Sequence, residues 1–305
     1  MKSIERFKKN TKSIEGRLRK KRIVVVSGGF SEERETSIES GDAVFTELKN
    51  KGFNVLKIDP IKDDILSFVD KNDIVFNCIH GVFGESGHLP AILDYLEIPY
   101  TFSGVYASAV SMDKIFFKAV LKKIGIPCLK DNFDKNKLKD GETVIHKKVR
   151  GGSSLGMVIS KNKNSKDGYI SELFVAGKPL TVGILEKEGK FETLGIVEVK
   201  LSGDIFYSEK VKFGGLGEYQ KYSGNLSKVI NNYAIEVAKF IGVKGCARVD
   251  FVQHKNKVYM LELNSVPGIH MESNLIFSAM LGDLSFYELI LWILDGACFE
   301  DIRLK

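Results

Sequence analysis

Short apolar runs and helix-spaced apolar positions alternate along the first third of the chain. Runs typical of buried strands cover residues 22–29 (RIVVVSGG), 53–59, 72–81 and 98–101, and helical spacing covers residues 37–52 and 91–99. Strands that alternate with helices in this way usually form a parallel sheet that is covered on both faces. The pattern therefore predicts an α/β domain at this end of the chain.

The remaining two thirds predict a mixed architecture. A helix is expected over residues 108–127 up to Gly125, mostly antiparallel strands over 143–149, 156–160 and 179–186, and further helices over 229–242 and 284–294. A chain of 305 residues also exceeds what one hydrophobic core usually serves. We therefore predict three domains after a short extension, with boundaries at residues 1–21, 22–105, 106–186 and 187–305.

Residues 245–268 (GCARVDFVQHKNKVYMLELNSVPG) read as two strands around a polar turn. If the turn centres on Asn256, Asp250 lies across from Glu262 and both carboxylates point to one face, because side chains alternate along a strand. Like charges placed in this way repel one another. A cation is therefore expected between them.

The chemistry of this acidic face allows two interpretations. Asp250, Glu262 and Asn264 offer hard oxygen ligands that suit Mg²⁺ carrying substrate phosphates, and Arg248 adds a donor for developing negative charge. Alternatively, the face is a solvated part of the sheet on which Arg248 bridges the acids. The residues alone leave both interpretations open.

Residues 146–160 (HKKVRGGSSLGMVIS) combine cationic, glycine and serine residues, a composition that is compatible with three functions. A Walker loop would need Lys and then Ser or Thr directly after Gly156, but Met157 follows. The G-x-S-x-G match would make Ser154 a hydrolase nucleophile, yet a helix should then follow, whereas the next residues are strand-like. The favoured reading is a hairpin that folds over phosphates, with Lys147 as a point charge.

The net charge of +6 is concentrated at one end of the chain. Residues 1–22 contain ten Lys or Arg and two Glu, a net +8, so the remainder carries −2. Apolar residues at helical steps predict an amphipathic helix here: Ile4, Phe7, Ile14 and Leu18, with Thr11 between them. A packing helix or solvated extension is favoured over a membrane or nucleic-acid role, and we expect no nucleic-acid partner.

Composition and cysteine placement are typical of a soluble protein of a reducing compartment. Apolar residues make up 44% and charged residues 28% of the chain. The four cysteines are scattered without a CxxC pair, which argues against a zinc site and favours a cytoplasmic location. The basic segment lacks the apolar core of a signal peptide, and no membrane span is expected.

Seven motifs in order resemble the D-alanine–D-alanine ligase family of the ATP-grasp superfamily, over about residues 22–289. They are VSGGFSEERETSIESG, IHGVFGESG, IPYTFSGVYASAVSMDK, GGSSLGM, LTVGIL, ARVDF and LELNSVPG. The resemblance implies an ATP-grasp fold in which an N-terminal parallel α/β domain is followed by two α+β domains that clamp ATP. It implies that ATP drives the condensation of two D-alanines through an acyl phosphate for peptidoglycan precursor synthesis, and a homodimer in the cytoplasm.

The resemblance also assigns roles to individual residues. It places ATP on Lys114, Lys147, Ser154, Glu172 and Lys212, with Glu172 at the adenine hinge and the lysines on the phosphates. It makes Asp250, Glu262 and Asn264 the ligands of two Mg²⁺ or Mn²⁺ ions. It places the substrates and their intermediate on Glu33, His80, Ser153, Arg248, the N–H of Gly268, and Ser273.

Two departures from the family pattern keep alternatives open. Phe213 stands where the family usually has a tyrosine whose hydroxyl would bond Ser153, and related ligases that depart here use a D-hydroxy acid, typically D-lactate, as second substrate. Pro179 replaces a glutamate expected on the ATP ribose. The chain is therefore expected to make D-alanyl-D-alanine, with a D-alanine–D-lactate or other specialised ligase, or a non-catalytic nucleotide-binding relative, as alternatives. A dinucleotide oxidoreductase is disfavoured because G-x-G-x-x-G is lacking.

Overall fold

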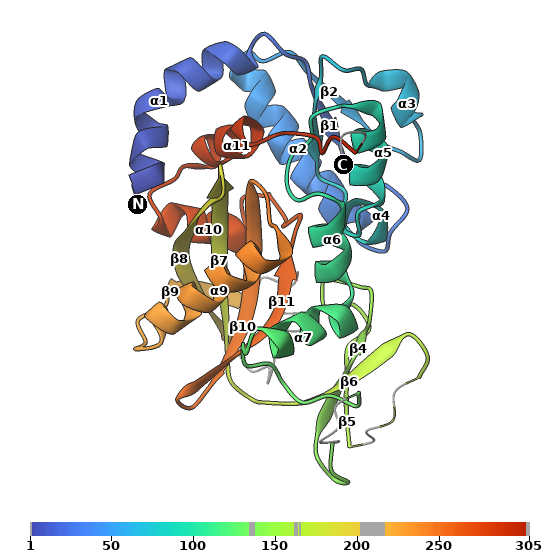
Figure 1. Ribbon diagram of the computed structural model, residues 1–305, viewed down its shortest axis with the longest axis vertical. Coiled ribbons are helices and arrows are strands. Elements are labelled where there is room, and N and C mark those ends of the chain that lie inside the picture. Colours follow the sequence, from blue (N-terminus) through green and yellow to red (C-terminus); the bar gives the residue numbers. More distant parts are fainter. Residues whose placement is uncertain (1, 134–137, 162–163, 165, 202–216, 303–305) are drawn as a thin grey trace.

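The computed structural model describes residues 2–133, 138–161, 164, 166–201 and 217–302, which carry three sheets (Figure 1). The first sheet contains three short parallel strands in the order β2-β1-β3: β1 (Ile23–Val26), β2 (Val55–Ile58) and β3 (Ile74–Asn77). The helices of this part are α2 (Arg34–Asn50), α3 (Ile65–Phe68), α4 (Val82–Glu85) and α5 (His88–Leu96). All side chains of β1 are buried, as expected for a parallel strand covered on both faces. The predicted α/β architecture is confirmed.

The fourth strand expected over residues 98–101 is wrong. Tyr100 makes one isolated parallel bridge to Val75 and one antiparallel bridge to Cys298, and no ladder forms. Pro99 explains this, because a proline has no N–H to donate to a neighbouring strand. The segment runs beside β3 without extending the sheet.

The prediction of one continuous helix over residues 108–127 is also wrong, because the structure contains two helices there. α6 (Val105–Met112) ends at Asp113, and α7 (Lys114–Lys123) begins directly after it. The Asp113 carboxylate accepts hydrogen bonds from the N–H groups of Ile115 and Phe116, as an N-terminal cap does. The break makes Lys114 the first residue of α7.

A second sheet is small and antiparallel. Its strands lie in the order β5-β4-β6: β4 (Val144–Lys148), β5 (Val158–Ser160) and β6 (Tyr169–Leu173). The Gly/Ser stretch 151–156 connects β4 to β5, so the hairpin predicted from the sequence is confirmed. This sheet lies at one end of the molecule next to α7 (Figure 1).

The third sheet is antiparallel, in the order β11-β10-β7-β8-β9. Its strands are β7 (Lys178–Lys187), β8 (Lys190–Leu201), β9 (Gly217–Lys221), β10 (Cys246–His254) and β11 (Lys257–Asn264). α9 (Ser227–Ile241) covers one face, and α10 (Asn274–Leu281) with α11 (Phe286–Asp295) covers the other (Figure 1). Two hydrophobic cores therefore flank the sheet.

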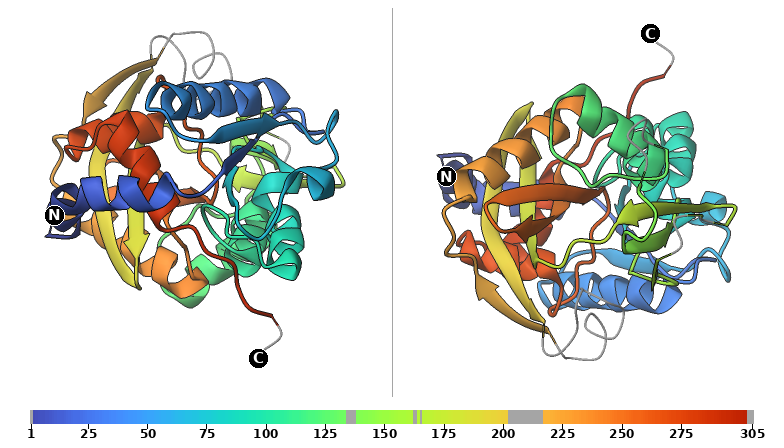
Figure 2. Two further views of the ribbon diagram at one scale, coloured as in Figure 1. Left: turned by 90° about the horizontal axis from the view of Figure 1, so that it is seen from above. Right: turned by 90° about the horizontal axis from the view of Figure 1, so that it is seen from below.

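The basic N-terminal segment is a packing helix. α1 (Lys2–Leu18) buries its apolar stripe in the core that also contains α11, and the rings of Phe7 and Trp292 lie 5.0 Å apart. Arg17 and Lys187 both form ion pairs with the buried carboxylate of Asp295. The helix therefore belongs to the folded body (Figure 2).

In the described part of the chain, no helix by itself has the length and apolarity to cross a membrane. Only α10 and α11 taken together pass such a test, and they are bent by 98° at the break between them.

Removal of the Phe7 ring tests how much α1 contributes to stability. Phe7 is 4% exposed, so Phe7→Ala should lower the free energy of unfolding by about 3 to 5 kcal/mol through lost burial and a cavity. Lys9→Ala, on the exposed side of the same helix, should change it by at most about 0.5 kcal/mol. Urea denaturation measures both. Equal, small effects would show that α1 does not stabilise the body.

Candidate active site

Three adjoining cavities lie where the sheets meet. The apolar cavity lies between the small and the large sheet, and its lining includes Lys147, Ser154, Asp250 and Glu262. The junction cavity is lined by residues that include Glu33, Lys114, Ser153, Arg248, Glu262 and Asn264. The polar cavity shares Glu33, Ser153, Arg248 and Asn264 with it and adds His80, Gly268 and Ser273. Glu262 therefore lies at the boundary between the apolar cavity and the junction cavity.

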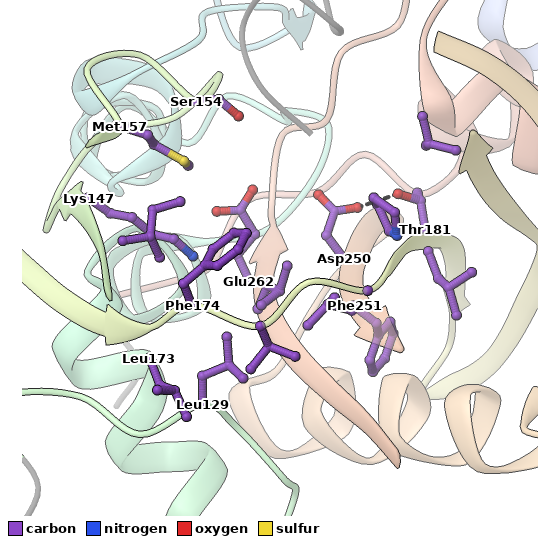
Figure 3. A pocket seen from close by; sticks show the side chains of 18 residues that line it. Leu129, Lys147, Ser154, Met157, Leu173, Phe174, Thr181, Asp250, Phe251 and Glu262 are labelled. Carbon is purple, nitrogen blue, oxygen red and sulfur yellow. Dashed lines mark hydrogen bonds between the residues drawn. The ribbon is translucent and has the colours of Figure 1, made fainter. Parts of the chain in front are cut away.

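The apolar cavity is lined mainly by hydrophobic side chains, together with a few charged groups. Its apolar walls include Leu129, Ile145, Met157, Phe174, Leu261 and Pro179. Lys147 enters from β4, and the carboxylates of Asp250 and Glu262 enter from the large sheet (Figure 3). This combination suits a ligand with a planar apolar part and an anionic part.

A bulge in the β10–β11 hairpin sets the positions of the two acids. At the turn, His254 pairs with Lys257. If this register continued along the hairpin, Asp250 would lie opposite Leu261. The register shifts by one residue between Phe251 and Asp250, so that Asp250 pairs with Glu262. The pairing predicted from the sequence is confirmed. The bulge is what places both acids on one face, because a one-residue shift exchanges the faces of a strand.

Asp250 has cationic and hydroxyl partners. Arg248 donates to it from Nε at 3.1 Å and from Nη2 at 2.7 Å, and Thr181 on β7 donates its hydroxyl at 2.6 Å. The Glu262 carboxylate points into the same space from β11 (Figure 3). The alternative interpretation, in which Arg248 bridges the two acids, therefore holds in part, since Arg248 pairs with Asp250.

The donor set fits a hard divalent cation that is also held by a ligand. Among the residues that the structure describes, no three His, Cys, Asp or Glu side chains gather closely enough to form a metal site by themselves. Two facing carboxylates and an amide oxygen nevertheless match Mg²⁺, which usually takes one or two protein carboxylates and completes its shell with water and phosphate oxygens. The residues present therefore fit a cation that arrives with an anionic substrate.

The Gly/Ser stretch between β4 and β5 folds directly over Glu33. Ser153 donates its hydroxyl to the Glu33 carboxylate, and a Cβ at Gly152 would lie 2.7 Å from a Glu33 oxygen. A side chain at position 152 would therefore displace the Glu33 carboxylate from its present position. Ser153 and Ser154 have φ of 51° and 59°, a left-handed conformation that costs free energy for serine and often occurs at functional sites.

Lys114 is held against the same stretch from α7. Its amine donates to the Gly151 carbonyl at 2.5 Å, and Arg150 pairs with Asp113 at 2.9 Å. The break at Asp113 therefore directs Lys114 into the junction cavity.

Glu172 lies behind the apolar cavity, where its carboxylate pairs with Lys118 at 2.7 Å and with Lys147 at 2.6 Å. Burial alone would raise the pKa of the Glu172 carboxyl, but the two lysines outweigh it and hold that pKa at about 2. Burial would likewise lower the pKa of Lys118, but Glu172 raises it above its usual value. The next residues on the chain, Leu173 and Phe174, line the cavity itself.

A chain of hydrogen bonds fixes His80 in the polar cavity. Its Nδ1 lies 3.3 Å from Glu85, and its Nε2 lies 3.2 Å from the Ser40 hydroxyl. That hydroxyl accepts from the N–H of Ile269, next to Gly268. One tautomer, with Nδ1–H donating to Glu85 and Ser40 donating to Nε2, satisfies all the groups. Ser273, also on the cavity wall, caps α10.

The sequence-predicted residues line these cavities, with two exceptions. Glu172 is buried behind the apolar cavity, and Lys212, like Phe213, lies outside the described residues. Sequence reasoning missed Thr181, Ser40 and Lys118. Thr181 lies opposite Asp250 on the neighbouring strand β7, a pairing that the sequence does not show. Lys118 had no signal of its own, because a lysine on a helix usually faces water.

The chain is similar to known proteins over most of its length. A family model described as "D-ala D-ala ligase C-terminus" matches residues 102–295. The D-alanine--D-alanine ligase of Sinorhizobium fredii is 34% identical over 304 residues, covering 91% of this chain and 98% of that protein. The D-alanine--D-alanine ligase of Aquifex aeolicus is 34% identical over 289 residues, covering 88% and 98%.

Solved structures share the fold. A D-alanine--D-alanine ligase from Bacillus anthracis, complexed with ATP, matches with a TM-score of 0.74 at 22% identity, covering 90% of this chain and 97% of that one. The D-alanyl-alanine synthetase A of Vibrio cholerae matches with a TM-score of 0.76 at 23% identity, covering 90% and 97%. The predicted ATP-grasp fold is confirmed.

Acid titration tests the ion pairs of Glu172. Its pKa is about 2 in the folded chain against an ordinary 4.5, so the ionised carboxylate stabilises the fold fully above that ordinary value. This contribution is lost as the pH falls from the ordinary value towards the folded one. The stability advantage of the wild type over Glu172→Gln should therefore shrink as the pH is lowered, in denaturant melts.

The control is Glu5→Gln, an exposed position on α1, for which the difference from the wild type should not change with pH. A pH-independent difference for Glu172→Gln would contradict the ion-pair assignment.

Proposed function

Since the chain belongs to the D-alanine–D-alanine ligase family, we propose that the three cavities form one active site in which ATP drives the joining of two D-alanine molecules. The protein is an ATP-grasp ligase. The observation that carries the assignment of the site is the Asp250–Glu262 pair, because it stands between a cavity suited to a nucleotide and cavities suited to amino acids.

The reaction has two steps. The carboxylate of the first D-alanine attacks the γ-phosphorus of ATP, so that ADP leaves and an acyl phosphate forms. The amine of the second D-alanine then attacks the acyl carbon, phosphate leaves, and the amine gives up a proton. Both steps concentrate negative charge at the junction cavity, where cationic donors stabilise it.

ATP would bind with its adenine in the apolar cavity and its phosphates towards the junction cavity. Lys147 and Lys114 enter these cavities from β4 and α7 and would bind phosphate oxygens, while Ser154 adds a hydroxyl. Lys212 is proposed as a third phosphate ligand from the family pattern alone. Pro179 leaves an apolar wall where a ribose-binding glutamate is usual, so weaker ribose binding is expected.

The family uses ATP together with a divalent metal. We propose two Mg²⁺ or Mn²⁺ ions, which Asp250, Glu262 and Asn264 would hold and which would neutralise charge on the ATP phosphates. The Asp250 carboxylate also holds Arg248 by several hydrogen bonds. Arg248 is therefore prepositioned beside the site of charge development.

The amino acids would occupy the polar cavity. Glu33 would bind the ammonium group of the first D-alanine. Ser153 holds the carboxylate of Glu33 by a hydrogen bond, and His80 lines the same cavity. Arg248 and the N–H of Gly268 would stabilise the tetrahedral oxyanion, and Ser273 would bind the carboxylate of the second substrate.

The named relatives support D-alanine as the second substrate and give no support to the D-lactate alternative. The departure at Phe213 keeps that alternative worth testing. We also propose a homodimer, action in the cytoplasm and a role in peptidoglycan precursor synthesis, all from family membership.

A product assay tests this function. With ATP and Mg²⁺, D-alanine alone should give ADP and D-alanyl-D-alanine in equal amounts, measured by coupled ADP release and mass spectrometry. Adding D-lactate should yield no ester product. Phosphate release without dipeptide, or a dominant ester product, would contradict the assignment.

Glu262→Gln supplies the test of the acidic face. The rate should fall by roughly 100-fold or more, since even groups that only orient a metal ligand change affinity or activity by about 10- to 100-fold. Higher Mg²⁺ should restore part of it. Glu236→Gln, at an exposed position on α9, is the matched control and should retain the wild-type rate.

A further inference from the structure

Five side chains of alternating charge connect the apolar cavity to the protein surface. Lys147 pairs with Glu172 at 2.6 Å, Glu172 with Lys118 at 2.7 Å, Lys118 with Asp131 at 3.3 Å, and Asp131 with Lys122 at 3.1 Å. Lys118 and Lys122 lie one turn apart on α7, Glu172 lies on β6, and Lys147 lies on β4. The line therefore joins a helix to both neighbouring strands of the small sheet.

The middle of this line is removed from water. The side chains of Lys118 and Glu172 are each 3% exposed, and that of Asp131 is 1% exposed. Buried charges without partners are strongly disfavoured, so each of these groups holds its neighbours in place. Within the line, Lys118 is the one cation that contacts both buried acids.

We propose that Lys118 is a positioning residue, which fixes the carboxylate of Glu172 so that Glu172 aims the amine of Lys147 into the nucleotide cavity. This inference rests on the proposed binding of ATP phosphates by Lys147. Glu172 contacts two lysines, so its single negative charge does not neutralise both. Lys147 therefore keeps an effective positive charge for the phosphates while its amine is held at a defined position.

Lys118 also lies on the helix that begins with Lys114, the second lysine proposed to bind phosphate. The amine of Lys118 donates to the Leu129 carbonyl at 2.5 Å, and Leu129 lines the nucleotide cavity. Lys118 stands one turn after Lys114, the first residue of α7. The contact between Lys118 and Glu172 therefore has two effects: it orients Lys147, and it holds α7, which carries Lys114, against β6.

Lys118→Met tests the proposal in the full-length protein. It should raise the KM for ATP roughly tenfold or more, the order expected when one charge-assisted hydrogen bond is lost, because Lys147 is no longer held. The KM for the first D-alanine should stay within about twofold. Lys123→Met, at an exposed position on the same helix, should leave both constants unchanged. An unchanged KM for ATP in Lys118→Met would overturn the proposal.

Glu172→Gln separates positioning from a general loss of structure. If Lys118 acts through Glu172, the double variant Lys118→Met/Glu172→Gln should have the same KM for ATP as Glu172→Gln alone. It also removes the buried carboxylate that has lost one of its two lysine partners, so it serves if Lys118→Met does not fold. A further increase in KM in the double variant would show that Lys118 acts by another route and would overturn the proposal.

Binding of ADP with Mg²⁺ gives a readout that does not depend on turnover. The nucleotide-induced rise in melting temperature should be smaller in Lys118→Met than in the wild type and normal in Lys123→Met. A wild type that neither binds the nucleotide nor forms dipeptide would defeat the proposed function itself. A wild type that does both, with a Lys118→Met variant that binds equally well, would defeat only the role of Lys118.

Discussion

The site depends on two carboxylates that a β-bulge forces to face one another. Without the extra residue at Leu261, Glu262 would point to the opposite face of β11 and Asp250 would lack an acidic neighbour. Facing like charges are unfavourable unless cations neutralise them. Arg248 neutralises Asp250 in part, and the divalent ions that accompany ATP would supply the remaining positive charge. The same repulsion that destabilises the hairpin therefore favours binding of those metal ions between the acids and the phosphates.

Around this pair, three separate parts of the chain contribute to one reaction volume. The parallel sheet supplies Glu33 and His80, the small sheet supplies the glycine-rich hairpin, and the large sheet supplies the acids. Asp113 links them, because it ends α6, caps α7 and pairs with Arg150 beside the hairpin. The left-handed serines of the hairpin adopt a costly conformation that the contact with Glu33 helps to hold.

Patterns with a strong local signal were predictable from the sequence. The buried β1 run, the amphipathic helix α1 and the hairpin around the Gly/Ser stretch followed from periodicity and turn chemistry. The pairing of Asp250 with Glu262 was predicted from a turn centred on Asn256, whereas in the structure the turn sets a register one residue off and the bulge restores the predicted pair. The break at Asp113 was not predicted, because the apolar spacing continues through it. An aspartate that can cap a helix is a local signal, and its pairing with Arg150 adds a tertiary contact that the sequence does not show. No strand forms around Pro99, because this residue has no N–H to donate. The apolar run over residues 98–101 nevertheless favoured the prediction of a strand there. Lys118 resembles any helical lysine in the sequence, and only the packing of α7 on β6 buries it against Glu172.

The most direct measurement of the central claim is the position of the metal. A crystal grown with Mn²⁺ and a non-hydrolysable ATP analogue should show anomalous density between Asp250, Glu262 and Asn264, in contact with the phosphates, with the adenine in the apolar cavity. Nucleotide bound in that cavity with no anomalous density at the two carboxylates, or with Mn²⁺ bound elsewhere, would contradict the account.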